Sequence, residues 1–305
     1  MADAGAGRSY APANFIVDID GYAVNFIKKF EGLSMEADIV ANDLGPDNFQ
    51  AKHVSNIKWT EGKITVGAGM GKGMYEWIKQ SFDKAYAPKN GTVTAANFDF
   101  KAQTQITFQS ALITKVGFPA LKGDSKDAIY LDVSFQPEIC RWGKGDGKDI
   151  RGNYGTKQKA WLAANFKVEI GSLPCTRVAS VDAFEWKCEC SPDQVGVTRE
   201  PTYHPAKVVT PDTKFSVSMA DYEQWQQAAK KWFIDGEHLA SNEMQGSITL
   251  LGPDMKKEVG RVDLVNMGFK KFSKEPFESG KNAIARFSVE FYCEGIKFTM
   301  SETDA

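Results

Sequence analysis

The stretch Asn14-Phe-Ile-Val-Asp-Ile19 returns 151 residues later as Asn165-Phe-Lys-Val-Glu-Ile170 (165 − 14 = 151). In both copies apolar and polar residues alternate, which is typical of a strand with one buried face. The same separation recurs along the chain in three further pairs: His53 with His204, Lys63-Ile-Thr-Val66 with Lys214-Phe-Ser-Val217, and Val116-Gly-Phe118 with Met267-Gly-Phe269. Val133-Ser-Phe135 and Val289-Glu-Phe291 match at a separation of 156 (289 − 133 = 156). Because the matches keep their order, the sequence predicts a tandem duplication.

A glycine-rich segment lies between the two copies. Residues 141–155 contain five glycines and six charged residues, a composition that predicts no packed element. We therefore expect a linker at 141–160, separating a first domain at 11–140 from a second at 161–300. Short tails would remain at 1–10 and 301–305.

Each copy is expected to contain many strands and one helix. Met74, Trp77, Ile78 and Phe82 have helical spacing, as do Tyr222, Trp225, Ala229, Trp232 and Phe233. These patterns predict helices at 74–83 and 221–233. The predicted strands are 14–19, 106–108, 111–118 and 128–135 in the first copy, and 166–170, 247–251, 258–267 and 283–292 in the second. The fold class is thus mainly β with one helix per domain (α+β), arranged as two tandem β-barrel or sandwich domains.

Composition excludes several function classes. Lys plus Arg is 37 and Asp plus Glu is 39, a balance that argues against binding to nucleic-acid phosphates. No apolar run approaches the roughly 20 residues of a membrane span, so we expect no membrane insertion. The start of the chain lacks the apolar core of a signal peptide.

The cysteines do not predict a metal site. They are Cys140, Cys175, Cys188, Cys190 and Cys293, and the chain has only three histidines. A structural zinc site would need a second close pair of ligands. We expect reduced thiols, no metal and a cytoplasmic place of synthesis.

The most suggestive chemical motif is Val66-Gly-Ala-Gly-Met-Gly-Lys-Gly73, which follows a predicted strand and opens a predicted helix. That is the setting of a phosphate-binding loop, but the register fails. A dinucleotide loop beginning at Gly67 would need glycine where Lys72 stands, and a Walker loop would need Ser or Thr where Gly73 stands. A flexible connection is favoured, and a nucleotide-binding enzyme using Gly67–Gly73 is the unlikely alternative.

No catalytic constellation is apparent elsewhere. His53 and His204 occupy matching positions after long polar stretches, and no nucleophile accompanies them in the sequence. We expect them to be turn or interface residues. The sequence therefore predicts a protein that is not an enzyme and that needs no cofactor.

The segment around the first helix carries a family resemblance. Lys63-Ile-Thr-Val-Gly67, a Gly-rich link and Met74-Tyr-Glu-Trp-Ile78 resemble the tail tube proteins of contractile phages and related injection systems. Other segments that resemble this family are Phe15–Ile19, Phe30–Leu33, Gly246–Leu251, Lys257–Asn266, Phe269–Phe272 and Asn282–Gly295. The resemblance covers both copies.

The resemblance implies a fold and an assembly. The fold would be a small β-barrel with a flanking helix, shared with the type VI secretion tube protein. Members form rings of six single domains, which stack into a tube around a lumen for DNA or protein cargo. Two domains per chain would close such a ring with three chains, giving a homotrimer with pseudo-sixfold symmetry.

The resemblance also implies partners and a location. These are sheath proteins, baseplate or cap proteins, and DNA or effector cargo that is bound without sequence specificity. The location would be a virion tail or an injection particle assembled in the bacterial cytoplasm. The alternative is a specialised end ring of the same particle, such as a tube initiator, baseplate hub or cap adaptor.

Two sets of residues are candidates for assembly. The polar segments 41–56 and 191–207 are predicted to be long loops, and in the family the equivalent loop reaches the next ring. The candidate ring-stacking residues are Asn42, Gly45, Phe49, His53, Asp193, Tyr203 and His204. The predicted strand at 282–294 is the candidate barrel wall, with its polar residues Arg286, Ser288 and Glu290 facing either the lumen or the outside.

Overall fold

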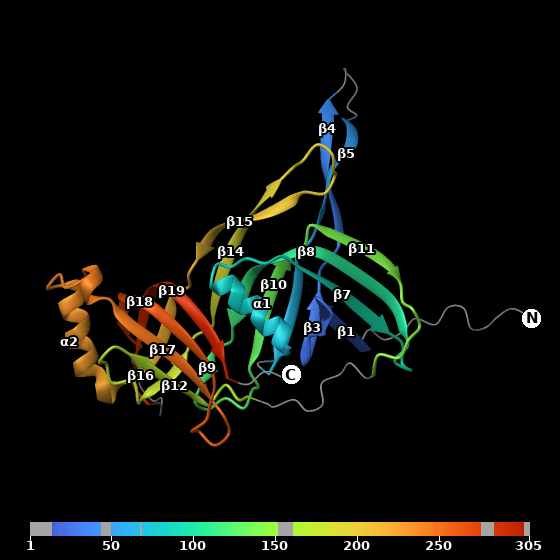
Figure 1. The fold of residues 1–305 in the computed structure, drawn as a ribbon. Helices are drawn as coiled ribbons and strands as arrows, with labels where there is room; N and C mark the ends of the chain where they lie inside the picture. Colours follow the sequence, from blue (N-terminus) through green and yellow to red (C-terminus); the bar gives the residue numbers. More distant parts are fainter. Residues whose placement is uncertain (1–13, 44–49, 68, 152–160, 276–283, 302–305) are drawn as a thin grey trace, which may run out of the picture.

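The computed structural model describes residues 14–43, 50–67, 69–151, 161–275 and 284–301. Figure 1 shows two strand-rich halves lying side by side, each with one α-helix. The first half contains β1 (Asn14–Ile19), β2 (Tyr22–Ala23), β3 (Ile27–Glu31), β4 (Met35–Asp43), β5 (Gln50–Trp59), β6 (Gly62–Gly67), α1 (Lys72–Phe82), β7 (Lys89–Ala96), β8 (Ala102–Phe118), β9 (Leu121–Lys122), β10 (Tyr130–Gln136) and β11 (Ile139–Lys144). The second contains β12 (Phe166–Ile170), β13 (Val178–Val181), β14 (Phe184–Asp193), β15 (Thr202–Val209), β16 (Thr213–Ser218), α2 (Tyr222–Phe233), β17 (Met244–Leu251), β18 (Glu258–Lys274) and β19 (Arg286–Met300). Short 3-10 turns, η2 (Met219–Asp221) and η3 (Ala240–Asn242), flank α2.

The two halves pair their strands in the same order. The first runs β1-β7-β8-β10-β6-β3 and the second β12-β17-β18-β19-β16-β13. Each half also carries a two-stranded hairpin, β4–β5 and β14–β15, with a register shift at the same place in both. The fold is therefore mainly β, with one helix per repeat of this order.

The ladders correct one of the sequence matches. Val116 lies opposite Val133, and Phe272 lies opposite Val289. In this part of the fold Val116 therefore corresponds to Phe272 (272 − 116 = 156), whereas the sequence match had aligned it with Met267. Short insertions between α2 and β18 shift the separation from 151 to 156.

A kink bends the longest strand of each half. Ser110 in β8 and Asn266 in β18 have φ of 52° and 53°, in the left-handed region that non-glycine residues rarely adopt. They occupy corresponding positions (266 − 110 = 156), and a polar side chain supports each one. The Oδ1 of Asn90 accepts a hydrogen bond from the Ser110 N–H at 3.0 Å, and Gln245 Nε2 donates to Asn266 Oδ1 at 3.0 Å. Such a kink lets one strand take part in two faces of a curved sheet.

The helices form where the apolar spacing predicted them. In α1 the buried side chains Met74, Trp77, Ile78 and Phe82 face the sheet. In α2 the buried residues are Trp225, Ala229 and Trp232. The helices pack differently, however: the last residue of α1, Phe82, contacts Phe118 of β8, whereas the first residue of α2, Tyr222, contacts Phe272 of β18. The superposition of helix 74–83 on helix 221–233 stays a prediction.

Two further expectations are corrected by the structure. Residues 41–56 and 191–207 are mostly the arms of the hairpins β4–β5 and β14–β15 and not long loops, because cross-strand pairing satisfies their backbones. The glycine-rich segment after residue 140 contains most of β11, which pairs with β8, and Ile150 is buried against Ile16, Ala96 and Ala102. The predicted strands 106–108 and 111–118 form one continuous strand, β8.

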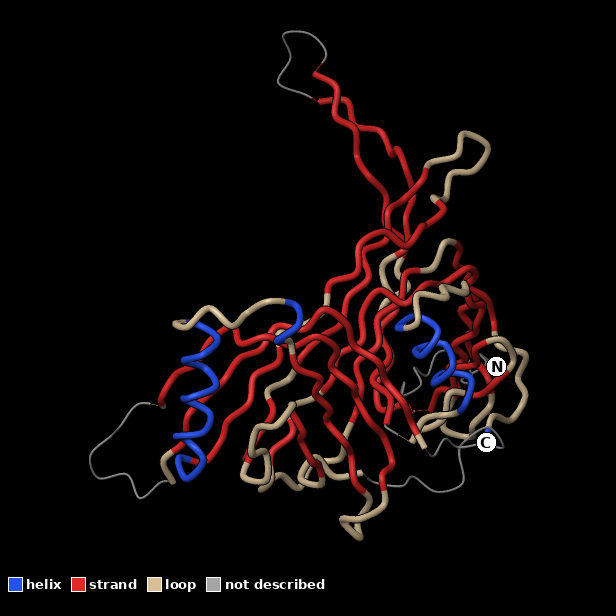
Figure 2. Tube along the Cα trace, turned by 60° about the vertical axis from the view of Figure 1, so that its left-hand side comes forward, coloured by secondary structure: helices blue, strands red, loops and turns tan. Residues whose placement is uncertain are grey.

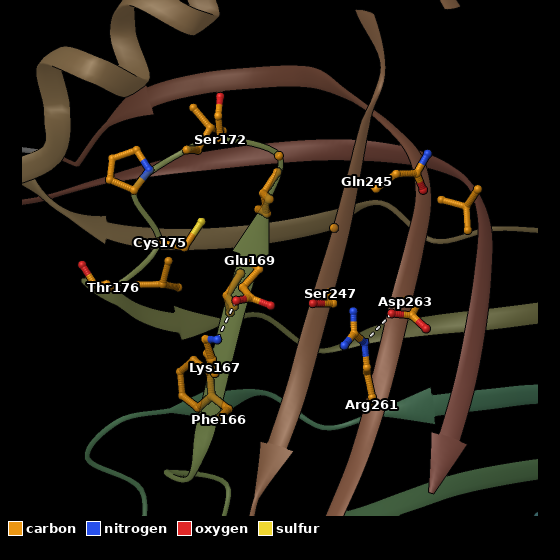
Figure 3. Close-up of a pocket in the computed structure, with 18 of the residues that line it drawn as sticks. Phe166, Lys167, Glu169, Ser172, Cys175, Thr176, Gln245, Ser247, Arg261 and Asp263 are labelled. Atoms are coloured by element: carbon orange, nitrogen blue, oxygen red, sulfur yellow. Dashed lines mark hydrogen bonds and ion pairs between the residues drawn. The ribbon is translucent and has the colours of Figure 1, made fainter. Parts of the chain in front are cut away.

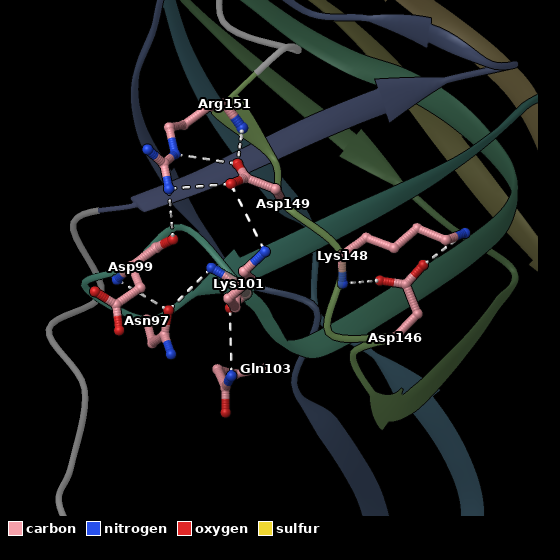
Figure 4. A network of polar contacts seen from close by, with 8 residues as sticks. All are labelled: Asn97, Asp99, Lys101, Gln103, Asp146, Lys148, Asp149 and Arg151. Carbon is pink, nitrogen blue, oxygen red and sulfur yellow. Dashed lines mark hydrogen bonds and ion pairs between the residues drawn. The ribbon is translucent and has the colours of Figure 1, made fainter.

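A polar network fastens the end of this segment to the turn between β7 and β8 (Figure 4). Asp149 pairs with Arg151 at 3.1 Å and with Lys101 at 3.8 Å, and Arg151 also donates to the backbone oxygen of Asp99. Among the described residues, no helix is long and apolar enough to cross a membrane.

Candidate assembly surfaces

Both hairpins leave the molecule on the same side (Figures 1 and 2). In β4–β5, Asn42 and His53 are exposed, while Gly45 and Phe49 lie outside the described residues. The hairpin also exposes four apolar side chains: Met35 (61%), Ile39 (57%), Val40 (47%) and Val54 (65%). An exposed apolar strand pair of this kind is a typical interaction surface.

The β14–β15 hairpin is bound to the first half of the chain. The Tyr203 N–H donates to Glu138 Oε1 at 3.0 Å. Arg141 makes a two-pronged ion pair with Glu200, at 2.5 and 3.1 Å, and Trp59 Nε1 donates to the same carboxylate at 3.3 Å. The hydrogen bond from Arg141 lowers the pKa of Glu200, so this carboxylate is ionised at neutral pH. Of the candidate residues in this hairpin, Tyr203 thus takes part in a contact between the halves, and Asp193 and His204 are exposed.

The two halves join through β14 and β8. Phe184 lies opposite Phe118, and Trp186 lies opposite Val116, in an antiparallel ladder. A smaller ladder joins β9 of the first half to β13 of the second. One half therefore offers the end of β8 and the other offers the β13–β14 side, so the contact is head to tail.

An aromatic cluster fills this junction. Phe118 stacks on Phe184 with ring centroids 4.8 Å apart, and Phe82 lies 4.9 Å from Trp186. Phe298 of β19 contacts both Phe118 and Phe82, at 5.4 and 6.4 Å. All five rings are buried, so the cluster holds the halves together mainly by apolar contact.

The candidate wall strand β19 alternates as predicted. Phe287, Val289 and Phe291 are fully buried beneath α2, with Phe287 only 5.9 Å from the ring of Trp225. On the opposite face Ser288 bonds Ser273 at 2.8 Å. The remaining polar residues, Arg286 and Glu290, share that face, and Glu290 pairs with Lys270 at 2.9 Å. The polar face of this sheet is thus the one turned away from the helix.

Shallow hollows mark the same polar face. One of them has a volume of about 900 Å³ and lies over β12, β17 and β18 (Figure 3). Four of its charged residues are paired, Lys167 with Glu169 at 2.5 Å and Arg261 with Asp263 at 2.6 Å, and Lys297 also lines it. Burial raises the pKa of its Cys175 to about 11, so this thiol is protonated at neutral pH and is a poor nucleophile. Most of the charge in this hollow is therefore neutralised by neighbouring side chains.

The Gly67–Gly73 motif does connect a strand to a helix, as expected, with Gly71 at the N-cap of α1. A Cβ on Gly71 would lie 2.7 Å from the carbonyl oxygen of Ala23, and one on Gly73 would lie 3.0 Å from Tyr22 Cβ. These glycines therefore let β2 pack against the start of the helix. A carbonyl oxygen at this place is unfavourable for an anionic phosphate.

The cysteines and histidines do not come together in one site. All five cysteines are free, and burial raises the pKa of Cys140 to about 12. His53 and His204 lie on different hairpins, opposite Val40 and Ser191. Within the described part of the chain, no group of three or more His, Cys, Asp or Glu side chains is placed to hold a metal ion.

Comparison with known protein families gives a match in the first half of the chain. Residues 11–136 match the family model described as T4-like virus tail tube protein gp19. This segment of the chain is therefore similar to the tail tube protein family. The match covers most of the first half of the chain and none of the second.

Solved structures that are similar to the chain share little sequence identity with it. One is a chain of the PVC extracellular contractile injection system in its extended sheath–tube complex (13% identity, TM-score 0.36, covering 44% of this chain and 88% of that one). Another is a chain of the anti-feeding prophage tube-terminating cap (13%, TM-score 0.41, 50% and 100%), and a third belongs to the anti-feeding prophage baseplate (10%, TM-score 0.35, 44% and 91%). No curated protein matches the chain.

The main signal that sequence reasoning missed is the junction between the halves. Phe184 and Trp186 alternate with Glu185 and Lys187, which is a strand pattern. Nothing in that pattern says that the partner strand is β8 of the other half. The family match includes the segments of the first copy that carried the resemblance, Phe15–Ile19, Phe30–Leu33 and Lys63–Ile78, and none of those in the second copy.

Proposed function

We propose that this chain is a non-catalytic structural component of a phage tail or contractile injection particle, in which three chains close into a ring of six tail tube domains. The division into domains at 11–140 and 161–300 is part of this proposal. The observation that carries it is the repetition of one strand order in two halves that are already joined head to tail. A head-to-tail contact that repeats can close into a ring.

The polar faces of the sheets are proposed to line the lumen, with Arg286, Ser288 and Glu290 on the wall. A water-filled channel needs a polar surface, and helices cover the opposite faces of these sheets. Ion pairs neutralise much of the charge on this surface, as in Lys29 with Glu31 and Lys214 with Asp182. Neutral walls would allow DNA or a protein effector to pass without binding tightly.

The exposed apolar residues of β4–β5 support a role for this hairpin in stacking one ring on the next. Asn42, Gly45, Phe49 and His53 belong to this proposed contact. In the second copy the proposed stacking residues are Asp193, Tyr203 and His204. Sheath proteins, and baseplate or cap proteins, are the proposed partners of the outer and end surfaces, in a particle assembled in the bacterial cytoplasm.

Electron microscopy of the purified protein, or of the particle that contains it, tests this proposal. We expect rings of three chains with six similar lobes, stacked into a tube. Rings of six chains, or a protein that stays monomeric under conditions of assembly, would contradict it.

An end ring is the second candidate. The two hairpins are not equivalent, because β14–β15 is bound to the first half through Glu200 and Tyr203, whereas β4–β5 pairs only with itself among the described strands. A ring with such hairpins has true threefold symmetry on that face, which suits contact with a threefold partner. Counting chains per particle separates the two, with three for an end ring and many for a tube.

A further inference from the structure

The junction inside the chain is a template for a contact between chains. At this junction β14 pairs antiparallel with the end of β8, Trp186 opposite Val116 and Lys187 opposite Lys115. Both of these strand segments, β14 and the end of β8, have a counterpart in the other half of the chain. The counterparts can be named from the strand registers alone.

On the second half, the counterpart of the β8 end is the end of β18. Phe272 lies opposite Val289 as Val116 lies opposite Val133, so Phe272 corresponds to Val116, and Lys271 corresponds to Lys115. The β17–β18 ladder stops at Met267. Beyond that residue β18 is paired on one side only, by β19, as far as the described strands extend.

On the first half, the counterpart of β14 is β4. The hairpins shift register between Ala37 and Ile39, and between Cys188 and Cys190, which are 151 residues apart. Met35 therefore corresponds to Trp186, and Glu36 to Lys187. Among the described strands β4 pairs only with β5, so its other edge is open.

We propose that β4 of one chain adds antiparallel to the end of β18 of a second copy of this chain, with Met35 opposite Phe272 and Glu36 opposite Lys271. This inference rests on the proposed function, because it supplies the junction that closes the ring. Backbone pairing along both open edges satisfies groups that would otherwise face water.

Exposed apolar side chains mark the β4 side of this contact. Trp186 and Phe298 are 2% exposed because they pack against the first half of the same chain. Their counterparts, Met35 and Trp142 (298 − 156 = 142), are 61% and 55% exposed. Trp142 lies beside this edge, since its indole N–H donates to the backbone oxygen of Leu33 at 3.2 Å. Two large apolar groups are thus exposed where the template buries two aromatic rings.

Charge also favours this register. At the internal junction Lys187 and Lys115 lie opposite each other, and Glu185 pairs with both, at 3.2 and 3.5 Å. At the proposed junction Glu36 faces Lys271 directly. Opposite charges across a strand pair stabilise it, and like charges destabilise it.

A disulfide between chains tests the register in the full-length protein. The double variant Glu36→Cys/Lys271→Cys should give a reducible ladder ending at the trimer on a denaturing gel. The control Lys52→Cys/Lys271→Cys places the first thiol far along the hairpin and should give no ladder. Equal cross-linking in both variants, or none in the first, would overturn the proposed pairing.

Charge reversal provides a second measurement that leaves the fold unchanged. Glu36→Lys alone or Lys271→Glu alone should lower ring yield about tenfold at low salt, and Glu36→Lys/Lys271→Glu should restore it. If the double variant is no better than either single variant, the pairing is wrong. Cross-linking at 36 and 271 in particles that are not three-chain rings would instead uphold the junction and reject the ring count.

Discussion

At the scale of single residues, two glycines differ in how much space the surrounding side chains leave. Gly268 lies beneath α2, where a Cβ would come within 2.3 Å of the Tyr292 ring and 2.4 Å of Trp232. Gly143, on β11, has open space around it. The residue type is the same at both positions, but only the first one is required by packing.

Replacing Gly268 with alanine should therefore destabilise the protein. The new methyl group must displace the buried ring of Trp232 and the partly buried ring of Tyr292, and overpacking of this kind costs roughly 1–3 kcal/mol. Thermal unfolding measures the effect, with Gly143→Ala as the matched control that should change little. Equal melting temperatures for the two variants would show that the site beneath α2 is looser than described.

The Arg141–Glu200 pair predicts a pH-dependent contribution to stability. Its hydrogen bond lowers the pKa of Glu200, so the contribution is present above the unfolded-state pKa of about 4.3 and is lost as pH falls through the folded-state value. Glu200→Gln should lower the free energy of unfolding by about 1 kcal/mol at pH 7, since the Arg141 side chain is largely exposed.

Urea unfolding at several pH values measures that difference. The gap between the wild-type protein and Glu200→Gln should close below about pH 4. Glu223→Gln, at an exposed position in the first turn of α2, is the control. A gap that widens on acidification would mean that the carboxylate is not held ionised by Arg141.

Lys72 supplies a residue-scale test of the nucleotide-binding alternative. It is exposed at the start of α1, and its contact with Glu76 is 3.8 Å long between two exposed side chains. Lys72→Ala should leave the melting temperature unchanged within error. Calorimetric titration with ATP should give no heat of binding with either protein, and binding that disappears in the variant would revive the enzyme.

At the scale of elements, the hairpin β4–β5 is the segment most separated from the rest of the fold (Figure 2). It forms its own two-stranded sheet, and its apolar side chains are exposed. An isolated two-stranded hairpin is marginal in water. Its length is therefore better explained by a contact that it makes in an assembly.

Deleting residues 45–49 should leave a folded protein that forms rings but stacks them poorly. The deletion shortens the connection between β4 and β5 and does not touch the Met35–Glu36 edge. Ring and tube formation are scored by electron microscopy, and folding by circular dichroism. A Gly-Ser replacement of the same length separates loss of length from loss of side chains, and normal tubes in the deletion variant would remove the stacking role.

At the scale of the whole molecule, the larger of two apolar clusters among the described residues runs through both halves. The aromatic cluster around Phe118 and Phe298 joins them, so the halves are expected to unfold together. This continuity also predicts that a residue of the cluster matters more than an exposed aromatic residue of similar size.

Trp186→Ala should cost roughly 3–5 kcal/mol, because it leaves a cavity between the halves. Trp142→Ala, which truncates a side chain that is 55% exposed, should leave the stability of the monomer nearly unchanged and weaken assembly. Differential scanning calorimetry of both variants measures this contrast. Similar losses in the two would place Trp142 in the monomer's own core and not at a contact between chains.

The sequence by itself determined the fold class and the position of both helices, and it predicted the repetition. Alternation at Asn14–Ile19 and helical spacing at Met74–Phe82 are local properties, so they could be interpreted without a fold. The resemblance to tail tube proteins rested on the same local patterns, and the family match to residues 11–136 agrees with it. The candidate assembly residues are still untested predictions, because no partner chain constrains them.

Only the tertiary structure decided which edges meet. Strand partners are chosen by long-range contacts, and the pattern of Phe184 to Lys187 is compatible with many of them. The same is true of the segment after residue 140, which glycine content marked as a linker and which pairing with β8 makes a strand. Insertions also hid the true correspondence of β8 and β18, because only hydrogen-bonded register fixes which residues lie opposite each other. For this reason only the structure identifies the open strand edges at Met35 and Phe272. An open edge is recognised by the lack of a neighbouring strand, and sequence alone does not show which strands are neighbours.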